Sequence, residues 1–190
     1  MHFDFNNIIL LFLSLIIFTF CLNYRVKIAE YFKILDKPDH RRKIHKHDTP
    51  LTGAFAIFLI FLFINLFNIF LNFFDSILVI ITINSSLIFL IGFYDDRKSL
   101  NPYFKLTLVG IIFLISLLFN DDLLLKNIYF SSINKRYVLN HYLSIFFTIL
   151  CLLLLINALN LVDGINGLAN ALITIWLLYI LFMNENDINN

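Results

Sequence analysis

Residues 53–73 read GAFAIFLIFLFINLFNIFLNF, a run without a single charged side chain. About 20 apolar residues, each adding about 1.5 Å, cross the hydrocarbon core of a bilayer as an α-helix. Because no water reaches this core, every backbone N–H and C=O needs a partner within the segment, and a helix provides one. The stretch therefore predicts a membrane-spanning helix.

Five further apolar runs of similar length lie on either side of this stretch. The six predicted helices cover residues 6–24, 53–73, 76–93, 103–119, 142–160 and 168–183. Hydrophobic residues make up 60% of the 190 residues and charged residues 14%, whereas a soluble domain is about half apolar and a quarter charged. The sequence predicts an all-α, polytopic integral membrane protein that forms a single transmembrane domain over residues 1–190.

The basic residues predict how these helices are oriented. Eleven of the 14 Lys and Arg residues lie between the first and second helices or between the third helix and the start of the fourth. The positive-inside rule places these connections in the cytoplasm, so both termini are predicted to lie outside it. The net charge of +1 gives no bias towards nucleic acid, and no nucleic-acid partner is expected.

Three polar segments fall on this predicted cytoplasmic face, at residues 36–53, 95–105 and 157–170. Polar segments that converge at one membrane face can form a single site, and we expect one here. Six helices with polar loops also suit a channel or transporter. The predicted spans carry no charged residue near their centres, however, and ion pathways usually need some.

The middle segment contains the acidic pair Asp95 and Asp96. Adjacent carboxylates repel each other unless a cation or a proton lies between them. Carboxylate oxygens are hard ligands that suit Mg²⁺, which also binds substrate phosphates. The pair therefore indicates a magnesium site, and the alternative is an ordinary solvated helix end.

The last segment places Asn157, Asn160 and Asp163 at intervals of three residues, roughly on one face of a helix. Amides and a carboxylate at the end of a membrane helix are costly unless they face a polar cavity. Gly164 and Gly167 permit tight turns and close approach of the backbone to a ligand. The alternative is a helix–helix contact made through amide hydrogen bonds.

The first segment is basic and ends in Thr49 and Pro50, which suit the beginning of the helix over 53–73. Basic side chains beside a membrane can hold anionic head groups or diphosphates. The alternative is that they serve only as a topology signal.

Taken in order, the three segments resemble the motifs of the polyprenyl-phosphate N-acetylhexosamine-1-phosphate transferases, or glycosyltransferase family 4, and the GlcNAc-type branch in particular. The motifs are DKPDHRRKIHKHDTPLTG at 36–53, GFYDD at 92–96 and NALNLVDGINGLA at 157–169. The resemblance implies transfer of a sugar 1-phosphate from a UDP-sugar, UDP-GlcNAc in that branch, to undecaprenyl phosphate. UMP is released in this first membrane step of a cell-envelope polysaccharide. The implied cofactor is Mg²⁺, with Mn²⁺ as the alternative, and the implied location is the bacterial inner membrane.

The resemblance also implies roles for individual residues. Those expected to take part in catalysis and metal binding are Asp95, Asp96 and Asp163. Those expected to bind the substrates are Lys43, His45, Lys46, Thr49, Asn157, Asn160, Gly164 and Asn166. Asn166 stands where the family motif carries Asp, which keeps hydrogen bonding but removes a charge.

The resemblance covers the N-terminal half of the family's fold. We therefore expect a separate C-terminal half, or a second copy of this chain, as the protein partner that completes the site. The alternative function is that of a truncated, inactive remnant or a membrane protein that binds lipid or nucleotide without catalysis.

Overall fold

The computed structural model describes residues 5–36, 49–71, 75–162 and 167–188. The chain divides into two compact units, Met1–Asn120 and Asp121–Asn190. The single transmembrane domain stays a prediction from the sequence.

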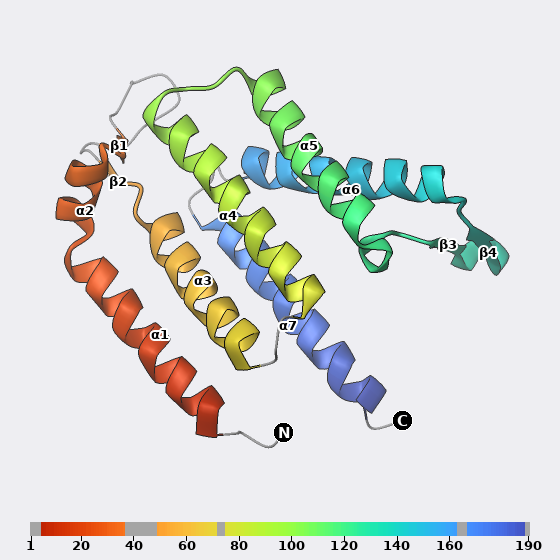
Figure 1. Ribbon diagram of the computed structural model, residues 1–190, viewed down its shortest axis with the longest axis horizontal. Helices are drawn as coiled ribbons and strands as arrows, with labels where there is room; N and C mark the ends of the chain where they lie inside the picture. The colour runs from red at the N-terminus through yellow and green to blue at the C-terminus, as the bar shows by residue number, and fades with distance from the viewer. Residues whose placement is uncertain (1–4, 37–48, 72–74, 163–166, 189–190) are drawn as a thin grey trace. The chain divides into compact units, whose positions relative to one another are not determined.

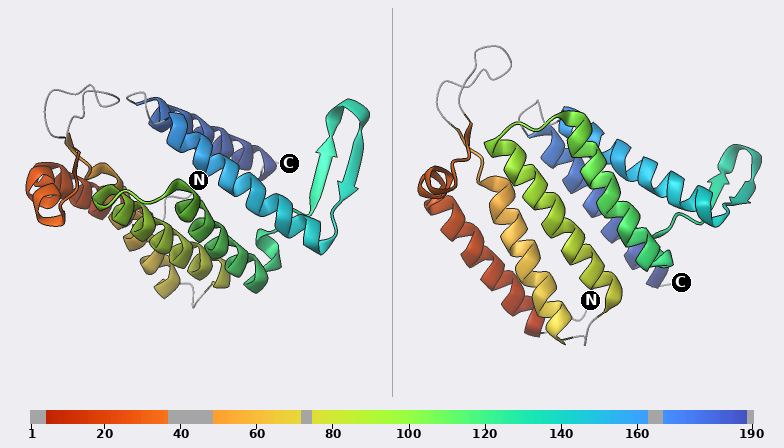
Figure 2. Two further views of the ribbon diagram at one scale, coloured as in Figure 1. Left: turned by 90° about the horizontal axis from the view of Figure 1, so that it is seen from above. Right: turned by 45° about the horizontal axis from the view of Figure 1, so that its top comes forward.

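The first unit is a row of membrane-length helices. α1 (Phe5–Asn23) packs against α3 (Gly53–Leu71), α3 against α4 (Ser76–Arg97), and α4 against α5 (Pro102–Phe119). Figures 1 and 2 show these helices side by side in the same order. The connections between α3, α4 and α5 are short, so α4 runs antiparallel to α3, and α5 runs antiparallel to α4. The first residues of α3, the last residues of α4 and the first residues of α5 therefore lie at the same end of the row.

A short helix and two short strands complete this end of the first unit. α2 (Arg25–Phe32) follows α1 after a single turn residue and ends at Lys33, which adopts a left-handed conformation with φ 57°. β1 (Leu35–Asp36) then pairs antiparallel with β2 (Thr49–Pro50), and Asp36 lies opposite Thr49. The sequence placed Pro50 at the start of a helix, but it lies in β2 and the helix begins at Gly53.

Polar residues are buried in the first unit beside apolar ones such as Ile34 and Leu117. The Ser116 hydroxyl on α5 donates to Asn84 Oδ1 on α4 over 2.7 Å, and the same hydroxyl contacts the Ile112 carbonyl at 2.8 Å. Asn65 on α3 is buried and donates to the Phe61 carbonyl over 2.8 Å. Helices in a membrane approach closely through small residues and hydrogen bonds, since lipid removes the hydrophobic drive for their association.

The second unit contains two helices and a two-stranded ribbon. The short 3₁₀ turn η1 (Asp121–Leu123) leads to β3 (Asn127–Phe130), and η2 (Ser131–Ile133) connects it to β4 (Lys135–Val138). α6 (His141–Val162) and α7 (Leu168–Ile188) follow and contact each other. Gly167, just before α7, has φ +81°, a conformation that glycine adopts without strain.

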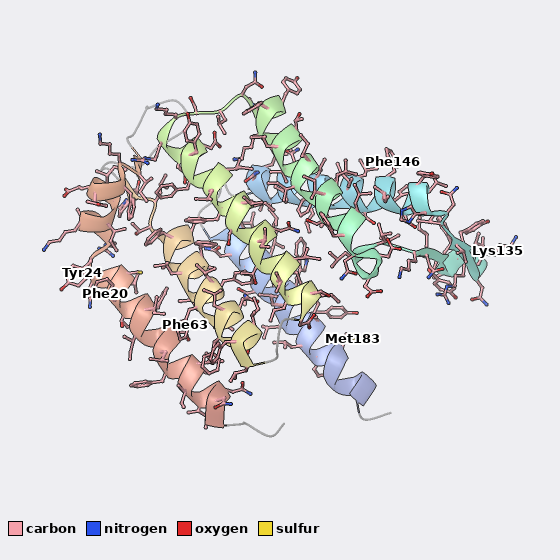
Figure 3. The ribbon with its side chains drawn as sticks, viewed as in Figure 1. Phe20, Tyr24, Phe63, Lys135, Phe146 and Met183 are labelled. Carbon is pink, nitrogen blue, oxygen red and sulfur yellow. The ribbon has the colours of Figure 1, made fainter. Side chains whose placement is uncertain are left out.

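Five of the described helices are long and apolar enough to cross a membrane, namely α1, α3, α4, α5 and α6. The apolar part of α7, Leu168–Met183, is shorter. These six helices begin and end within a few residues of the six predicted runs. Large apolar side chains project outward along them (Figure 3), as expected of helices surrounded by lipid. The all-α, multi-pass membrane fold predicted from the sequence is confirmed.

Candidate functional site

The polar end of the first unit is formed by α2, the β1–β2 pair, the start of α3, the end of α4 and the start of α5. The Leu51 N–H donates to the Ile34 carbonyl over 3.1 Å, which ties the segment before α3 to the end of α2. Ile34 is almost fully buried at this junction. The end is therefore a defined structure in which segments distant in the sequence lie together.

An aromatic cluster lies beneath this end and holds α2, α3 and α4 together. Its members are Phe32 on α2, Phe55 and Phe58 on α3, and Phe89 and Phe93 on α4. The rings of Phe58 and Phe89 stack nearly parallel with their centroids 3.9 Å apart, and Phe32 meets Phe93 edge-on at 5.6 Å. Aromatic pairs stabilise such contacts beyond the area they bury, so the cluster fixes the end of α4.

A short turn between α4 and α5 sets the geometry of the acidic pair. The Asn101 side chain accepts from the Tyr103 N–H over 2.9 Å and caps α5, and Pro102 occupies the first turn, where no N–H is needed. α5 therefore starts immediately beside the last turn of α4. Lys105, in the first turn of α5, consequently faces the carboxyl end of α4.

Asp95 is held by two donors from this turn. Its Oδ1 accepts from the Leu100 N–H and its Oδ2 from Lys105 Nζ, both over 2.7 Å. The side chains of Lys105 and Asp95 are 29% and 25% exposed. Charge-assisted hydrogen bonds of this length are among the strongest in proteins. Each oxygen of Asp95 therefore has a fixed direction before any ligand binds.

Asp96 follows Asp95 on α4 but has different surroundings. Successive helical residues point about 100° apart, so Asp96 is exposed while Asp95 turns towards α5. The guanidinium of Arg97 lies over the Phe93 ring, 5.6 Å from its centroid. The last turn of α4 thus places two carboxylates near cations that include Arg97 and Lys105, at the end of a membrane-spanning helix.

The structure places the other predicted site residues as follows. Thr49 lies exposed on β2 at the polar end. Asn157 and Asn160 lie exposed near the end of α6, in the second unit. The remaining predicted residues fall outside the described parts of the chain, namely Lys43, His45, Lys46, Asp163, Gly164 and Asn166.

The described residues supply two of the three predicted metal ligands. Within those residues no three His, Cys, Asp or Glu side chains are grouped so that they could hold a metal ion. Asp95 and Asp96 nevertheless offer carboxylate oxygens, the donors that Mg²⁺ prefers. Their chemistry fits this ion, with Asp95 constrained by Lys105 and Leu100.

The sequence places Lys105 in the polar segment 95–105, but it does not predict the ion pair between Lys105 and Asp95. The ten-residue separation has no helical periodicity, so no pairing rule applies to it. The signal that could have found the pair is Asn101–Pro102, a typical helix start. It places Lys105 in the first turn of the helix that runs antiparallel to the one ending at Arg97.

Comparison with known proteins supplies one match. The family model described as Glycosyl transferase family 4 matches residues 78–189, more than half of the chain. The match includes Asp95, Asp96, Asn157 and Asn160 and begins after β2. No curated protein and no solved structure matches the chain.

Proposed function

The chain belongs to glycosyl transferase family 4, and from this membership we propose that it transfers N-acetylhexosamine 1-phosphate from a UDP-sugar to undecaprenyl phosphate. A phosphate oxygen of the lipid attacks the phosphorus that carries the sugar. The bond from that phosphorus to UMP breaks, and the products are undecaprenyl-diphospho-sugar and UMP. UDP-GlcNAc is the donor that the sequence of the first polar segment favours.

The observation that carries this proposal is the position of Asp95 and Asp96 at the end of a helix that crosses the membrane. A water-soluble nucleotide sugar and a lipid phosphate meet only at the membrane surface. Both are anionic, so their approach requires cations to offset the repulsion. The polar end provides Arg97 and Lys105 beside the two carboxylates, which supports a site for phosphates there.

We assign different roles to the two carboxylates. Asp95 is directed by Lys105 and Leu100, so it is suited to positioning the lipid phosphate or accepting its proton. Asp96 is exposed and is suited to binding Mg²⁺. The family resemblance implies Asp163 as a further ligand. When bound, this ion would neutralise charge on the phosphates that react.

We propose that the other predicted residues bind the substrates. The basic segment with Lys43, His45 and Lys46, together with Thr49 on β2, binds the diphosphate of the nucleotide. The amides and the glycine of the third motif bind the nucleotide itself, and they are Asn157, Asn160, Gly164 and Asn166. We also propose that a separate C-terminal half or a second copy of the chain completes the site in the inner membrane.

The test is release of UMP from membranes that contain this chain, with UDP-GlcNAc, undecaprenyl phosphate and Mg²⁺. The reaction is run with the chain alone and with a co-expressed C-terminal half from the same family. UMP release that disappears in Asp96→Asn and with EDTA supports the proposal. No release from either preparation, at confirmed membrane levels of the chain, contradicts it.

A binding measurement distinguishes a transferase from a membrane protein that binds the nucleotide sugar without catalysis. Asn166 stands where the family motif carries Asp. The amide can still form hydrogen bonds, but without the carboxylate charge it binds a metal ion more weakly. Saturable binding of UDP-GlcNAc without UMP release, under both conditions, would identify a nucleotide-binding membrane protein instead.

A further inference from the structure

The β3–β4 ribbon with its tip, residues 127–138, is a part of the second unit that the proposed transfer does not use. Large apolar and aromatic side chains cover it, with exposed fractions between 48% and 77%. They are Tyr129, Phe130, Ile133, Tyr137 and Val138. So many exposed rings on a small ribbon indicate a surface that contacts something other than water.

The ribbon also carries two cations, one on each face. In the register of the strands Phe130 lies opposite Lys135 and Tyr129 lies opposite Arg136. Because side chains alternate along a strand, these two pairs project from opposite faces. Residues 127–138 contain no Asp or Glu. Each face therefore combines an aromatic ring with a positive charge.

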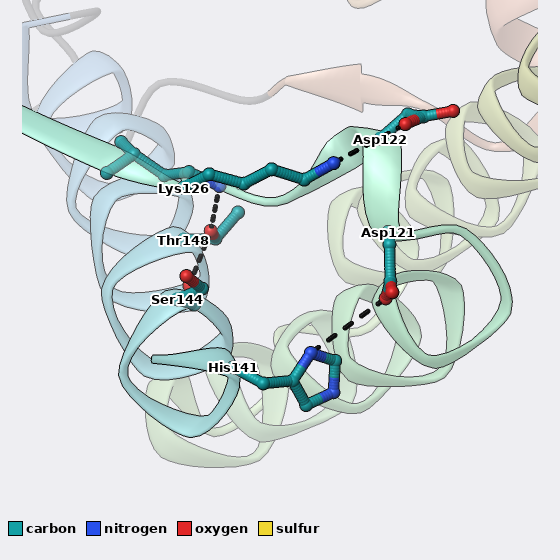
Figure 4. A network of polar contacts seen from close by, with 7 residues as sticks. Asp121, Asp122, Lys126, His141, Ser144 and Thr148 are labelled. Atoms are coloured by element: carbon teal, nitrogen blue, oxygen red, sulfur yellow. Dashed lines mark hydrogen bonds and ion pairs between the residues drawn. The ribbon is translucent and has the colours of Figure 1, made fainter. Parts of the chain in front are cut away.

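The base of the ribbon is attached to the start of α6 (Figure 4). The Leu139 N–H donates to the Lys126 carbonyl over 2.9 Å and closes the ribbon. The Leu125 N–H donates to the Thr148 hydroxyl over 2.9 Å, and that hydroxyl donates to the Ser144 carbonyl over 2.6 Å. The ribbon is thus held beside the first two turns of a membrane-spanning helix.

Lys126 at the base has an acidic partner, whereas Lys135 and Arg136 on the ribbon have none among the described residues. Lys126 Nζ lies 3.5 Å from Asp122 Oδ1, and His141 Nδ1 lies 4.0 Å from Asp121 Oδ1. Across the described parts of the chain, neither Lys135 nor Arg136 forms an ion pair. Figure 3 shows Lys135 on the β3–β4 ribbon. The two cations are available to an anionic partner.

We propose that this ribbon lies in the membrane–water interface and binds anionic phospholipid head groups through Lys135 and Arg136. α5 and α6 are consecutive helices that are long and apolar enough to cross a membrane, so we expect the chain between them at a membrane surface. Tyr and Phe rings suit the depth of the head groups, and Lys and Arg are attracted to anionic lipid. The ribbon anchors the start of α6 at that surface.

The experiment uses the full chain with a fluorescent label at Ile133→Cys, in a background with Cys21→Ser and Cys151→Ser. The protein is placed in phosphatidylcholine vesicles with increasing phosphatidylglycerol. Two quenchers report on the label, aqueous iodide and a lipid with a nitroxide on its head group. We expect phosphatidylglycerol to reduce iodide quenching at least threefold and to increase nitroxide quenching.

Charge variants identify the residues responsible. Lys135→Gln and Arg136→Gln each raise the phosphatidylglycerol fraction needed for half-maximal protection about fivefold. Lys126→Gln is the matched control, since Lys126 is paired with Asp122 at the base, and it leaves that fraction unchanged. Circular dichroism confirms that each variant keeps its helix content.

Three outcomes would overturn the proposal. One is iodide access that is equal in every lipid mixture, because the ribbon then lies in water. Another is protection in phosphatidylcholine that phosphatidylglycerol does not increase, because the head groups are then not recognised by charge. The third is equal protection in detergent without phospholipid, because another protein segment then covers the ribbon.

Discussion

Lys105 Nζ lies 2.7 Å from Asp95 Oδ2, so the first turn of α5 holds the last turn of α4 through a charge-assisted hydrogen bond. The second oxygen of Asp95 accepts from the Leu100 N–H in the turn between the two helices. The carboxylate is therefore positioned by the α4–α5 turn, and its neighbour Asp96 is left exposed at the same end. This relationship distinguishes the two carboxylates and leads to the first two predictions.

Removing the ammonium group of Lys105 should reduce the proposed activity. We expect Lys105→Gln to lower UMP release about tenfold, equivalent to about 1.4 kcal/mol, because Asp95 loses the donor that fixes Oδ2. Lys105→Arg, which keeps the charge, should restore part of the rate. Lys98→Gln is the control, as it removes an exposed cation from the same turn. Equal effects of Lys98→Gln and Lys105→Gln would indicate that only the overall charge matters.

The two carboxylates should respond differently to magnesium. Asp96→Asn is expected to raise the Mg²⁺ concentration for half-maximal UMP release at least tenfold, because an amide is a weaker ligand than a carboxylate. Asp95→Asn should lower the maximal rate with a smaller shift in Mg²⁺ dependence, because both Asp95 oxygens are already engaged. Titration of Mg²⁺ after EDTA treatment measures both. The reverse pattern would assign the ion to Asp95.

The hydrogen bond between Ser116 and Asn84 should contribute to stability within the membrane. We expect Ser116→Ala to lower the free energy of unfolding by about 0.5–1.5 kcal/mol, because the Asn84 amide loses its partner on α5. Unfolding in mixed micelles with increasing denaturing detergent provides the measurement. Ser14→Ala is the matched control, because the Ser14 hydroxyl donates to the Leu11 carbonyl of its own helix. A loss of the same size in both variants would show that the α4–α5 bond has no special role.

Phe89 should be the most sensitive member of the aromatic cluster, because its ring contacts Phe55, Phe58 and Phe93. Phe89→Ala is expected to reduce the free energy of unfolding by about 1–3 kcal/mol through lost ring contacts and burial. Phe119→Ala, which removes a ring that is 80% exposed, serves as the comparison and should have little effect. Thermal unfolding in detergent can measure both variants. Similar destabilisation by the two would contradict a structural role for the cluster.

Several features could be predicted from the sequence because they depend on local properties. The run over 53–73 specifies a helix by length and apolarity alone, since lipid offers the backbone no other partner. Asp95 and Asp96 stand out as adjacent carboxylates beside an apolar run, and the three polar segments carry the family motifs in order. The match of the family to residues 78–189 confirms that resemblance.

Other features did not follow from local pattern. The β3–β4 ribbon lies between the predicted helices 103–119 and 142–160, where no strand was predicted, and two strands of four residues are too short to give a clear alternating pattern. The β1–β2 pair likewise depends on contact between residues 35–36 and 49–50, which are distant in the chain. Strand pairing of this kind is a property of the folded chain.

By itself, the sequence determined the membrane-spanning helices, the polar segments and the family. Each of these depends only on which residue types occur, and at what spacing, within a short stretch of the chain. Only the tertiary structure decided that Lys105 and Leu100 hold Asp95, and that Phe32 on α2 meets Phe93 on α4. The physical reason is that hydrogen bonds and ring contacts act over a few ångströms in space. Which side chains come that close is decided by how the turns direct one helix against the next.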